Sequence, residues 1–248
     1  MLVVFLCAIG VGGATVVGAL IGFVFKDISH RFSNFVVSFA AGIMLSAAVL
    51  GLILPAVEYG GDWGIFIAVA GIFIGGICIN LSDRLVPHIH KLVGLGSDGM
   101  SSKARGVLLF VIAIGIHNLP EGIAAGVGFG TGDIENAVLI ASGIALHNIP
   151  EGMVIIAPML GAGITPKKTF VCALVTGSAE VVGTLIGYFA VSVASAILPF
   201  ALAFAGGAML YVISEEMIPE SHASGEECKV TYAFLCGFCA MLVLDAVM

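Results

Sequence analysis

The chain has 248 residues, of which 60% are hydrophobic and only 10% are charged, and its mean hydropathy is +1.17. A soluble domain carries about 25% charged residues, so this composition excludes a soluble protein and predicts one embedded in a lipid bilayer. The formal net charge of −7 argues against nucleic acid as a partner.

Eight charge-poor runs are each long enough to cross a bilayer, which takes about 20 mostly apolar residues in a helix. In chain order these runs are 2–25, 33–56, 63–82, 106–130, 136–160, 169–193, 196–218 and 230–247. They fill almost the whole chain and leave one long loop, 83–105. We therefore expect an all-α integral membrane protein with eight transmembrane helices in a single domain, 1–248.

The positive residues predict how these helices are oriented. All the lysines and arginines fall in loops that an eight-span chain places on one side of the membrane: Lys26, Arg31, Arg84, Lys91, Lys103, Arg105, Lys167, Lys168 and Lys229. By the positive-inside rule that side is the cytoplasm. The pattern predicts a multi-pass protein of the cell membrane with a cytoplasmic loop 83–105 and both termini outside.

The fourth and fifth runs contain the same six-residue motif with one conservative change. The copies are His117-Asn118-Leu119-Pro120-Glu121-Gly122 and His147-Asn148-Ile149-Pro150-Glu151-Gly152. Within each copy the histidine and the glutamate are four residues apart, so both lie on one face of a helix. The intervening proline lacks an N–H group and clashes with the carbonyl four residues earlier, so we expect it to kink the helix.

Both motifs are predicted to lie near the middle of the bilayer. At ~1.5 Å per residue, His117 and Glu121 lie about 14–20 Å from the outer end of the fourth run, and Glu180 of the sixth run lies about 18 Å from Lys168. Ionisable residues at that depth are costly and usually functional. Three glutamates there need a cation or protons to neutralise them. Like motifs on antiparallel helices also suggest a pseudo-two-fold axis in the membrane plane.

The residue types of this group are those of a metal site. Imidazole, carboxylate and amide ligands suit zinc, iron(II), manganese or cobalt, and the lack of a thiolate cluster argues against copper(I). The number of ligands permits two adjacent metals. Met44, halfway along the second run, is either a thioether ligand or a packing residue. The alternative for the whole group is that its polar side chains only join helices, but the repeated spacing and the third acid at matching depth favour a metal site.

These residues resemble the ZIP (Zrt-, Irt-like) divalent metal transporters, in particular the GufA-like and bacterial zinc transporter branch. The resemblance covers the whole chain. Besides the paired motif it includes Phe39-Ala40-Ala41-Gly42-Ile43-Met44, Ala179-Glu180-Val181-Val182-Gly183, Gly207-Ala208-Met209-Leu210-Tyr211 and Glu216-Met217-Ile218-Pro219-Glu220. It implies import of a divalent metal toward the cytosol and a homodimer.

The resemblance also implies which residues hold the metal. A binuclear site would be formed by His117, Asn118, Glu121, His147, Asn148, Glu151 and Glu180, with Met44 at its edge. An inner release path would use Glu215 and Glu216. The chain departs from the pattern at His147 and Asn148, where some members carry Gln and Asp, and at Glu215, where some carry His.

The expected function is therefore transport, not catalysis, with no cofactor apart from the transported ion. Zinc is the first expectation, and iron, manganese, cobalt and cadmium are alternatives. A passive metal-selective channel is the other mode of transport that the residues allow. An intramembrane metalloprotease would need a His-Glu-x-x-His string, which this chain does not contain.

Overall fold

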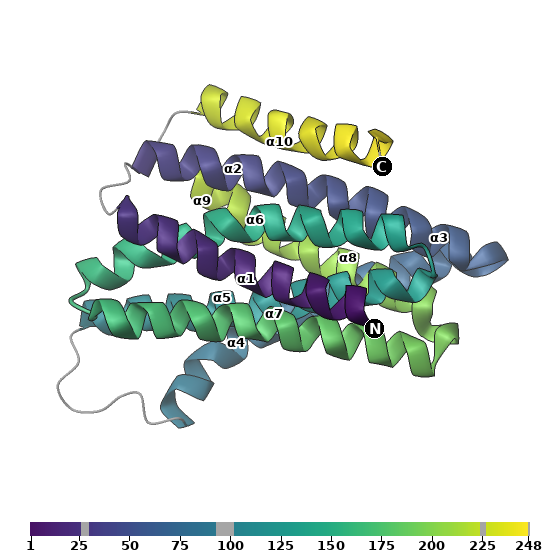
Figure 1. Ribbon diagram of the computed structural model, residues 1–248, viewed down its shortest axis with the longest axis horizontal. Coiled ribbons are helices and arrows are strands. Elements are labelled where there is room, and N and C mark those ends of the chain that lie inside the picture. Colours follow the sequence, from purple (N-terminus) through teal and green to yellow (C-terminus); the bar gives the residue numbers. More distant parts are fainter. Residues whose placement is uncertain (26–29, 93–101, 224–226, 248) are drawn as a thin grey trace.

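The computed structural model describes residues 1–25, 30–92, 102–223 and 227–247, and within these ranges the chain is helical throughout (Figure 1). Lys26 and residues 93–101 of the predicted loop 83–105 lie outside the described residues. The α-helices are α1 (Leu2–Val24), α2 (His30–Ser46), α3 (Leu54–Tyr59), α4 (Gly64–Leu92), α5 (Ser102–Gly128), α6 (Ile134–Gly161), α7 (Pro166–Val193), α8 (Leu198–Val212), α9 (Ile218–His222) and α10 (Glu227–Val247).

Seven described helical segments are long and apolar enough to cross a membrane, which confirms a multi-span membrane protein. They are Leu2–Val24, Arg31–Tyr59, Gly61–Ser82, Ile134–Gly161, Pro166–Val193, Leu198–His222 and Cys228–Val247. The remaining predicted run, 106–130, corresponds to α5, a helix of 27 residues that contains the first motif. The helices α4 and α5 also extend into the predicted loop 83–105, to Leu92 and from Ser102.

Two of the spans contain a π-helical segment shortly before a proline. The segment η1 (Ala47–Ile53) joins α2 to α3, whose second residue is Pro55, and η5 (Ile213–Met217) joins α8 to α9, whose second residue is Pro219. A proline removes one backbone N–H group and clashes with the carbonyl four residues earlier, and a widened helical turn before it accommodates both effects. Neither motif proline is preceded by such a segment, and α5 and α6 continue through both; the kinks expected there stay a prediction.

Local signals set the helix ends around α6. Asp133 caps its N-terminus, and the carboxylate accepts a hydrogen bond of 3.1 Å from the backbone N–H of Asn136. Pro166 occupies the first turn of α7, where the N–H group that it lacks is not needed. Gly132 and Gly163 have φ angles of 81° and 80° in the turns on either side of α6, a conformation that favours glycine.

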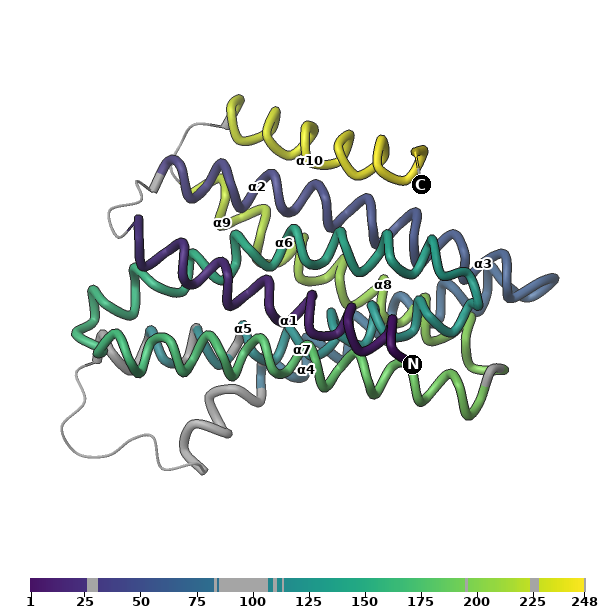
Figure 2. Tube along the Cα trace, viewed as in Figure 1, coloured from purple at the N-terminus to yellow at the C-terminus, as the bar shows by residue number. Residues whose placement is uncertain are grey.

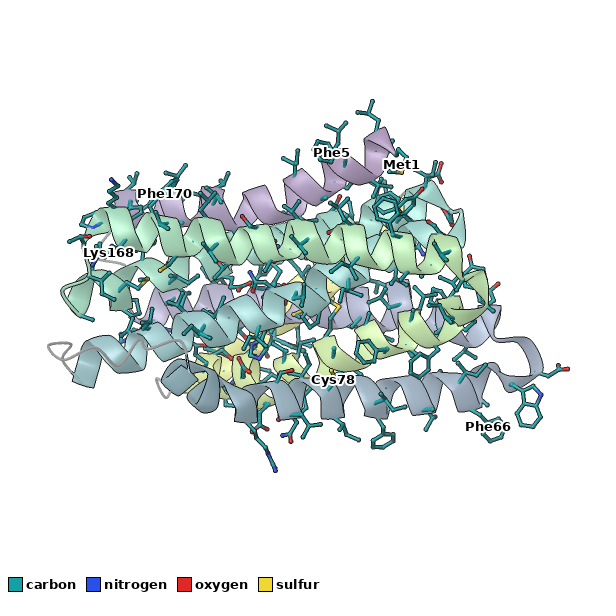
Figure 3. The ribbon with its side chains drawn as sticks, turned by 90° about the horizontal axis from the view of Figure 1, so that it is seen from below. Met1, Phe5, Phe66, Cys78, Lys168 and Phe170 are labelled. Atoms are coloured by element: carbon teal, nitrogen blue, oxygen red, sulfur yellow. The ribbon has the colours of Figure 1, made fainter. Side chains whose placement is uncertain are left out.

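The helices pack in two sets. In one set α5 packs along α7, and α1 packs along α6 and α7. In the other, α4 packs along α8 and α10 packs along α2 (Figures 1 and 2). Both termini lie at the same end of the bundle (Figure 2), and Lys168 lies at the opposite end from Met1 (Figure 3).

The outer surface of the bundle is apolar. Phe5 and Phe66 are 51% and 65% exposed and lie on the outside of the helices (Figure 3). Aromatic side chains on α1, α4 and α10 are exposed in the same way, far beyond what a soluble monomer presents to water. Exposure of these side chains to water would cost free energy, and the hydrocarbon of a bilayer around the helices removes that cost.

Candidate metal centre

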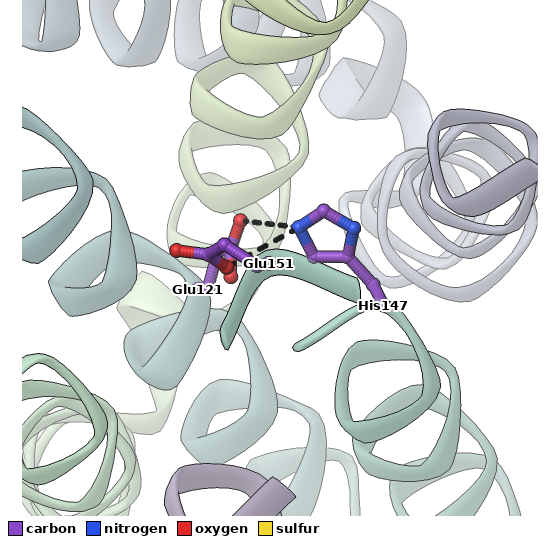
Figure 4. Close-up of side chains that lie close together, drawn as sticks. All are labelled: Glu121, His147 and Glu151. Carbon is purple, nitrogen blue, oxygen red and sulfur yellow. Dashed lines mark ion pairs between the residues drawn. The ribbon is translucent and has the colours of Figure 1, made fainter. Parts of the chain in front are cut away.

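Three side chains from the two motifs converge between α5 and α6. Glu121 comes from α5, whereas His147 and Glu151 come from successive turns of α6, and each offers a ligand atom within 4.8 Å of the others. The Nε2 atom of His147 is 3.5 Å from Oε1 of Glu121 and 3.5 Å from Oε2 of Glu151 (Figure 4). One imidazole nitrogen and two carboxylates therefore face a common point. This donor set suits zinc and similar divalent metals.

The group is buried and not fully hydrogen-bonded. Glu121 and His147 are only 3% and 5% exposed. Among the described residues, neither the Oε2 atom of Glu121 nor the Nδ1 atom of His147 has a hydrogen-bond partner. A buried carboxylate without a partner is costly unless a cation or a proton neutralises it. The group is therefore incomplete as it stands, and a divalent cation would complete it.

His117 lies beside this group and faces a different partner. Its Nε2 atom is 3.2 Å from Oε1 of Glu216, which belongs to η5 on the other set of helices. His117, Glu216 and Glu220 line the same cavity of ≈70 Å³ as the three converging residues. That volume holds an ion with a few waters, since one water needs about 10–15 Å³.

A larger cavity of ≈500 Å³ adjoins the first and shares Pro150, Val154 and Glu220 with it. Its other walls come from the beginning of α2, including Asn34, and from the end of α6, including Gly161. It therefore leads from the buried group toward the end of the bundle where the positive residues of α7 lie.

Glu180 forms a second polar cluster, behind the first. Its carboxylate is fully buried and accepts three hydrogen bonds. Oε1 accepts from the Thr15 hydroxyl at 2.7 Å and from the Asn118 amide at 2.5 Å, and Oε2 accepts from the Asn148 amide at 2.6 Å. None of these four residues is among those lining the cavity around His147. The predicted ligands thus divide into a group on the cavity and a hydrogen-bonded group beside it.

Two predicted residues neither line either cavity nor form the hydrogen bonds described at Glu180. Met44 is 1% exposed and packs in the apolar core with Ala41 and Ala48, one helical turn after Ala40, which lines the smaller cavity. Glu215 is exposed and is not among the lining residues of either cavity, whereas its neighbour Glu216 is.

The glycine that ends each motif lets a further helix approach. A Cβ atom at Gly122 would overlap the carbonyl oxygen of Glu180 on α7, and one at Gly152 would overlap the carbonyl oxygen of Thr15 on α1. Only glycine lets the backbones come this close. The motif helix α5 therefore contacts α7 at Glu180, and the motif helix α6 contacts α1 at Thr15. Both contact residues belong to the second polar cluster.

Thr15 is the member of this cluster that the sequence analysis missed. A signal was present, because residues 12–23 repeat in residues 177–188. The segments are Gly-Gly-Ala-Thr-Val-Val-Gly-Ala-Leu-Ile-Gly-Phe and Gly-Ser-Ala-Glu-Val-Val-Gly-Thr-Leu-Ile-Gly-Tyr, identical at eight of twelve positions. In this alignment Thr15 corresponds to Glu180.

Comparison with known proteins gives consistent matches along the chain. A family model described as "ZIP Zinc transporter" matches residues 94–245. The protein named zinc transporter GufA of Myxococcus xanthus is 40% identical over 240 residues, covering 94% of each chain. Zinc transporter ZIPB of Bordetella bronchiseptica is 33% identical, covering 94% of this chain and 77% of its own. Zinc transporter ZIP11 of Homo sapiens is 30% identical, covering 94% of this chain and 93% of its own.

Proposed function

The chain belongs to the ZIP family of zinc transporters, and from this premise we propose that it carries zinc across the membrane through the group formed by Glu121, His147 and Glu151. As a member of this family it is a transporter and not an enzyme. One observation carries the assignment of the group: three ligand atoms lie within 4.8 Å of one another in a buried place where a carboxylate oxygen lacks a partner. The transported ion is the missing partner.

His117 adds a ligand on the cavity side. It lines the same cavity as the three converging residues, and its Nε2 atom is 3.2 Å from Oε1 of Glu216. The imidazole of His117 binds a metal only when it is neutral. When His117 binds the metal in place of the Glu216 carboxylate, that carboxylate is released and can bind the ion next. Iron(II), manganese, cobalt and cadmium meet the same donor set, so selectivity among them is an outcome of the transport test below.

A second ion is proposed beside the first, with Glu180, Asn118 and Asn148 as its ligands and Glu121 and Glu151 bridging. The Oδ1 atoms of both asparagines are buried without a hydrogen-bond partner in the described part of the chain, so they are free to bind a cation. Oε2 of Glu180 accepts a hydrogen bond from the Asn148 amide and has a second acceptor position that would bind the metal. Met44 stays the predicted thioether at the edge of the site.

We propose eight spans with both termini outside, in one domain that covers residues 1–248. The seven candidate spans leave α5 as the eighth, and two termini at the same end of the bundle require an even number of crossings. The positive residues Lys167 and Lys168 lie at the other end, which the positive-inside rule assigns to the cytoplasm. The cell membrane and a homodimer, both predicted above, complete the proposal.

The larger cavity supports release toward the cytoplasm. It shares Glu220 with the smaller cavity and extends to Gly161 at the end of α6, whereas Glu216 lines the smaller cavity with His117 and Glu121. An ion leaving the site would meet Glu216 first and Glu220 next. Of the two acids predicted for release, Glu216 is therefore assigned to the path.

Uptake of zinc into proteoliposomes tests this function. We expect saturable uptake by the wild-type protein and competition by other divalent metals in an order that gives the selectivity. Preloading the vesicles with unlabelled zinc should accelerate uptake of labelled zinc, because a carrier returns faster when loaded, whereas a passive channel shows no such counterflow. No zinc uptake above that of empty vesicles would refute the proposal.

A further inference from the structure

We propose that Thr15 on α1 is a positioning residue of the transport site. Its hydroxyl holds the Glu180 carboxylate in the orientation that binds the amides of Asn118 and Asn148, and each asparagine directly follows a motif histidine. The inference rests on the proposed function and adds a residue to it. It depends on an internal repeat, on helix packing that follows that repeat, and on the hydrogen bonds themselves.

The repeat places Thr15 at the position that Glu180 occupies in the other copy. Segments 12–23 and 177–188 differ at four positions, and this is one of them. The exchange of an acid for a hydroxyl gives the pair opposite hydrogen-bonding roles. The hydroxyl of Thr15 donates and the carboxylate of Glu180 accepts, at 2.7 Å.

The packing of the helices obeys the same correspondence. The carbonyl of Thr15 lies against Gly152 of the second motif, as that of Glu180 lies against Gly122 of the first. Three residues later, Gly18 receives the carbonyl of Ile149, and its counterpart Gly183 receives that of Leu119. Thus α1 packs on α6 as α7 packs on α5. The two copies meet where Gly12 and Gly177 lie against each other's carbonyl oxygens.

This arrangement joins four helices at a single carboxylate. Oε1 of Glu180 uses both of its acceptor positions, one for Thr15 and one for Asn118, so loss of the hydroxyl frees that oxygen to turn. The amide of Asn148 also donates to the carbonyl of Val11 at 3.2 Å, which ties α6 to α1 at a second point. Thr15 therefore acts on the motif helices through Glu180, without touching the ion at the cavity.

Two variants of Thr15 and one control variant separate the effect of the hydroxyl from that of packing. Thr15→Val keeps the shape and removes the donor, whereas Thr15→Ser keeps the donor and removes a methyl group. Thr176→Val is the matched control, because Thr176 is a buried threonine of α7 whose hydroxyl, among the described residues, donates to the carbonyl of Ala173 in its own helix. Zinc binding by calorimetry and the KM and Vmax of uptake are measured for each, with the thermal unfolding midpoint as a check on folding.

We expect Thr15→Val to weaken zinc binding and to raise KM by roughly 10-fold or more, the loss that removal of an outer hydrogen-bond partner produces at a metal site. Thr15→Ser and Thr176→Val should stay within about twofold of the wild type, since neither loses that donor. If Thr15→Val does not fold, Thr15→Ala against Thr15→Ser makes the same comparison.

Two results would overturn the inference. Wild-type affinity in Thr15→Val would show that the hydroxyl does not position the site, and an equal loss in the Val and Ser variants would assign the effect to packing. Absence of zinc uptake by the wild-type protein is a separate result, which refutes the proposed function whatever the variants do.

Discussion

His147 of α6 and Glu121 of α5 lie 3.5 Å apart, between the imidazole Nε2 and the carboxylate Oε1, and both are almost fully buried. Each belongs to a different copy of the repeated motif, so the contact joins the two copies. Glu151 reaches the same imidazole nitrogen from the next turn of α6. The ligand set is thus shared between two helices, and its geometry depends on how these helices are held together.

Removing the charge of Glu121 should abolish high-affinity binding. Glu121→Gln keeps the volume of the side chain but replaces a charged ligand by a weak one, so we expect zinc affinity to fall at least about 100-fold, beyond the effect of an outer-shell change. Calorimetry on the purified protein measures this directly. Glu58→Gln, at an exposed glutamate after the second predicted span, is the control and should bind zinc like the wild type. Equal affinity in Glu121→Gln and the wild type would remove Glu121 from the site.

Two neighbouring glutamates offer a matched test of the release path. Glu216 lines the cavity and pairs with His117, whereas Glu215 is exposed. Glu216→Gln should lower Vmax of uptake several-fold with little change in zinc affinity, because Glu216 binds the ion after it has left the site and is not a ligand in the site. Glu215→Gln should transport normally. The reverse order of effects would place the path on the other face of η5.

Acid should compete with zinc. His147 must be neutral to bind the metal, and any protonated carboxylate of the site must give up its proton. Apparent affinity should therefore be highest above the range of imidazole titration and fall as pH decreases from about 7 to about 5.5. Calorimetry in two buffers of different ionisation enthalpy counts the released protons. A count of zero across this range would show that the empty site is already deprotonated.

Cysteine labelling tests the orientation. In a background without cysteines, Asp62→Cys lies in the 3₁₀ segment η2 (Gly61–Trp63), at the end that we assign to the outside, and Lys168→Cys lies at the opposite end. An impermeant thiol reagent added to intact cells should label the first and not the second. Both should react after the membrane is permeabilised, which controls for accessibility. Labelling of Lys168→Cys in intact cells would invert the topology.

The glycines that end the two motifs should not tolerate a methyl group. At Gly122 and Gly152 a Cβ atom would overlap backbone oxygen atoms, which cannot turn away as a side chain can, so Gly→Ala should cost roughly 1–3 kcal/mol. Gly13→Ala is the control, because no atom lies within 4 Å of a Cβ there and alanine favours a helix. Thermal unfolding in detergent should give lower midpoints for the first two variants and an unchanged or higher midpoint for the third. Equal midpoints in all three would contradict the close packing at the motif glycines.

Seven of the eight predicted spans correspond to described helices long and apolar enough to cross a membrane, because the physics behind such spans is local. A run of about 20 apolar residues must be helical in a bilayer, whatever its neighbours are. Spacing within one helix was equally reliable, and His147 and Glu151 do share a face. The π-helical segments before Pro55 and Pro219 were not foreseen, because the sequence marks the proline but not how the preceding turn adjusts to it.

Which residues meet across helices could not be predicted, since it depends on how each helix is rotated against the next. Asn118 follows His117 directly, and one residue turns the helix by about 100°. The histidine thus faces the cavity, while the asparagine faces Glu180. Thr15 looked like one more small residue in an apolar run. Only the comparison of its segment with residues 177–188 distinguishes it.

The charge of the two buried carboxylates that flank His147 determines how the membrane potential would act on the proposed transport cycle. Ionised and empty, Glu121 and Glu151 carry two negative charges, whereas one Zn²⁺ neutralises them. In an alternating-access cycle the loaded site then crosses the electric field without net charge, and the ionised empty site crosses it with two charges. Each elementary charge moved through the whole membrane potential gains or loses about 2.3 kcal/mol per 100 mV, so at 100 mV the return of the ionised empty site changes by about 4.6 kcal/mol. If the empty site returns ionised, an interior-negative potential drives that return outward and accelerates uptake at saturating zinc; if both carboxylates return protonated, the potential does not act on them.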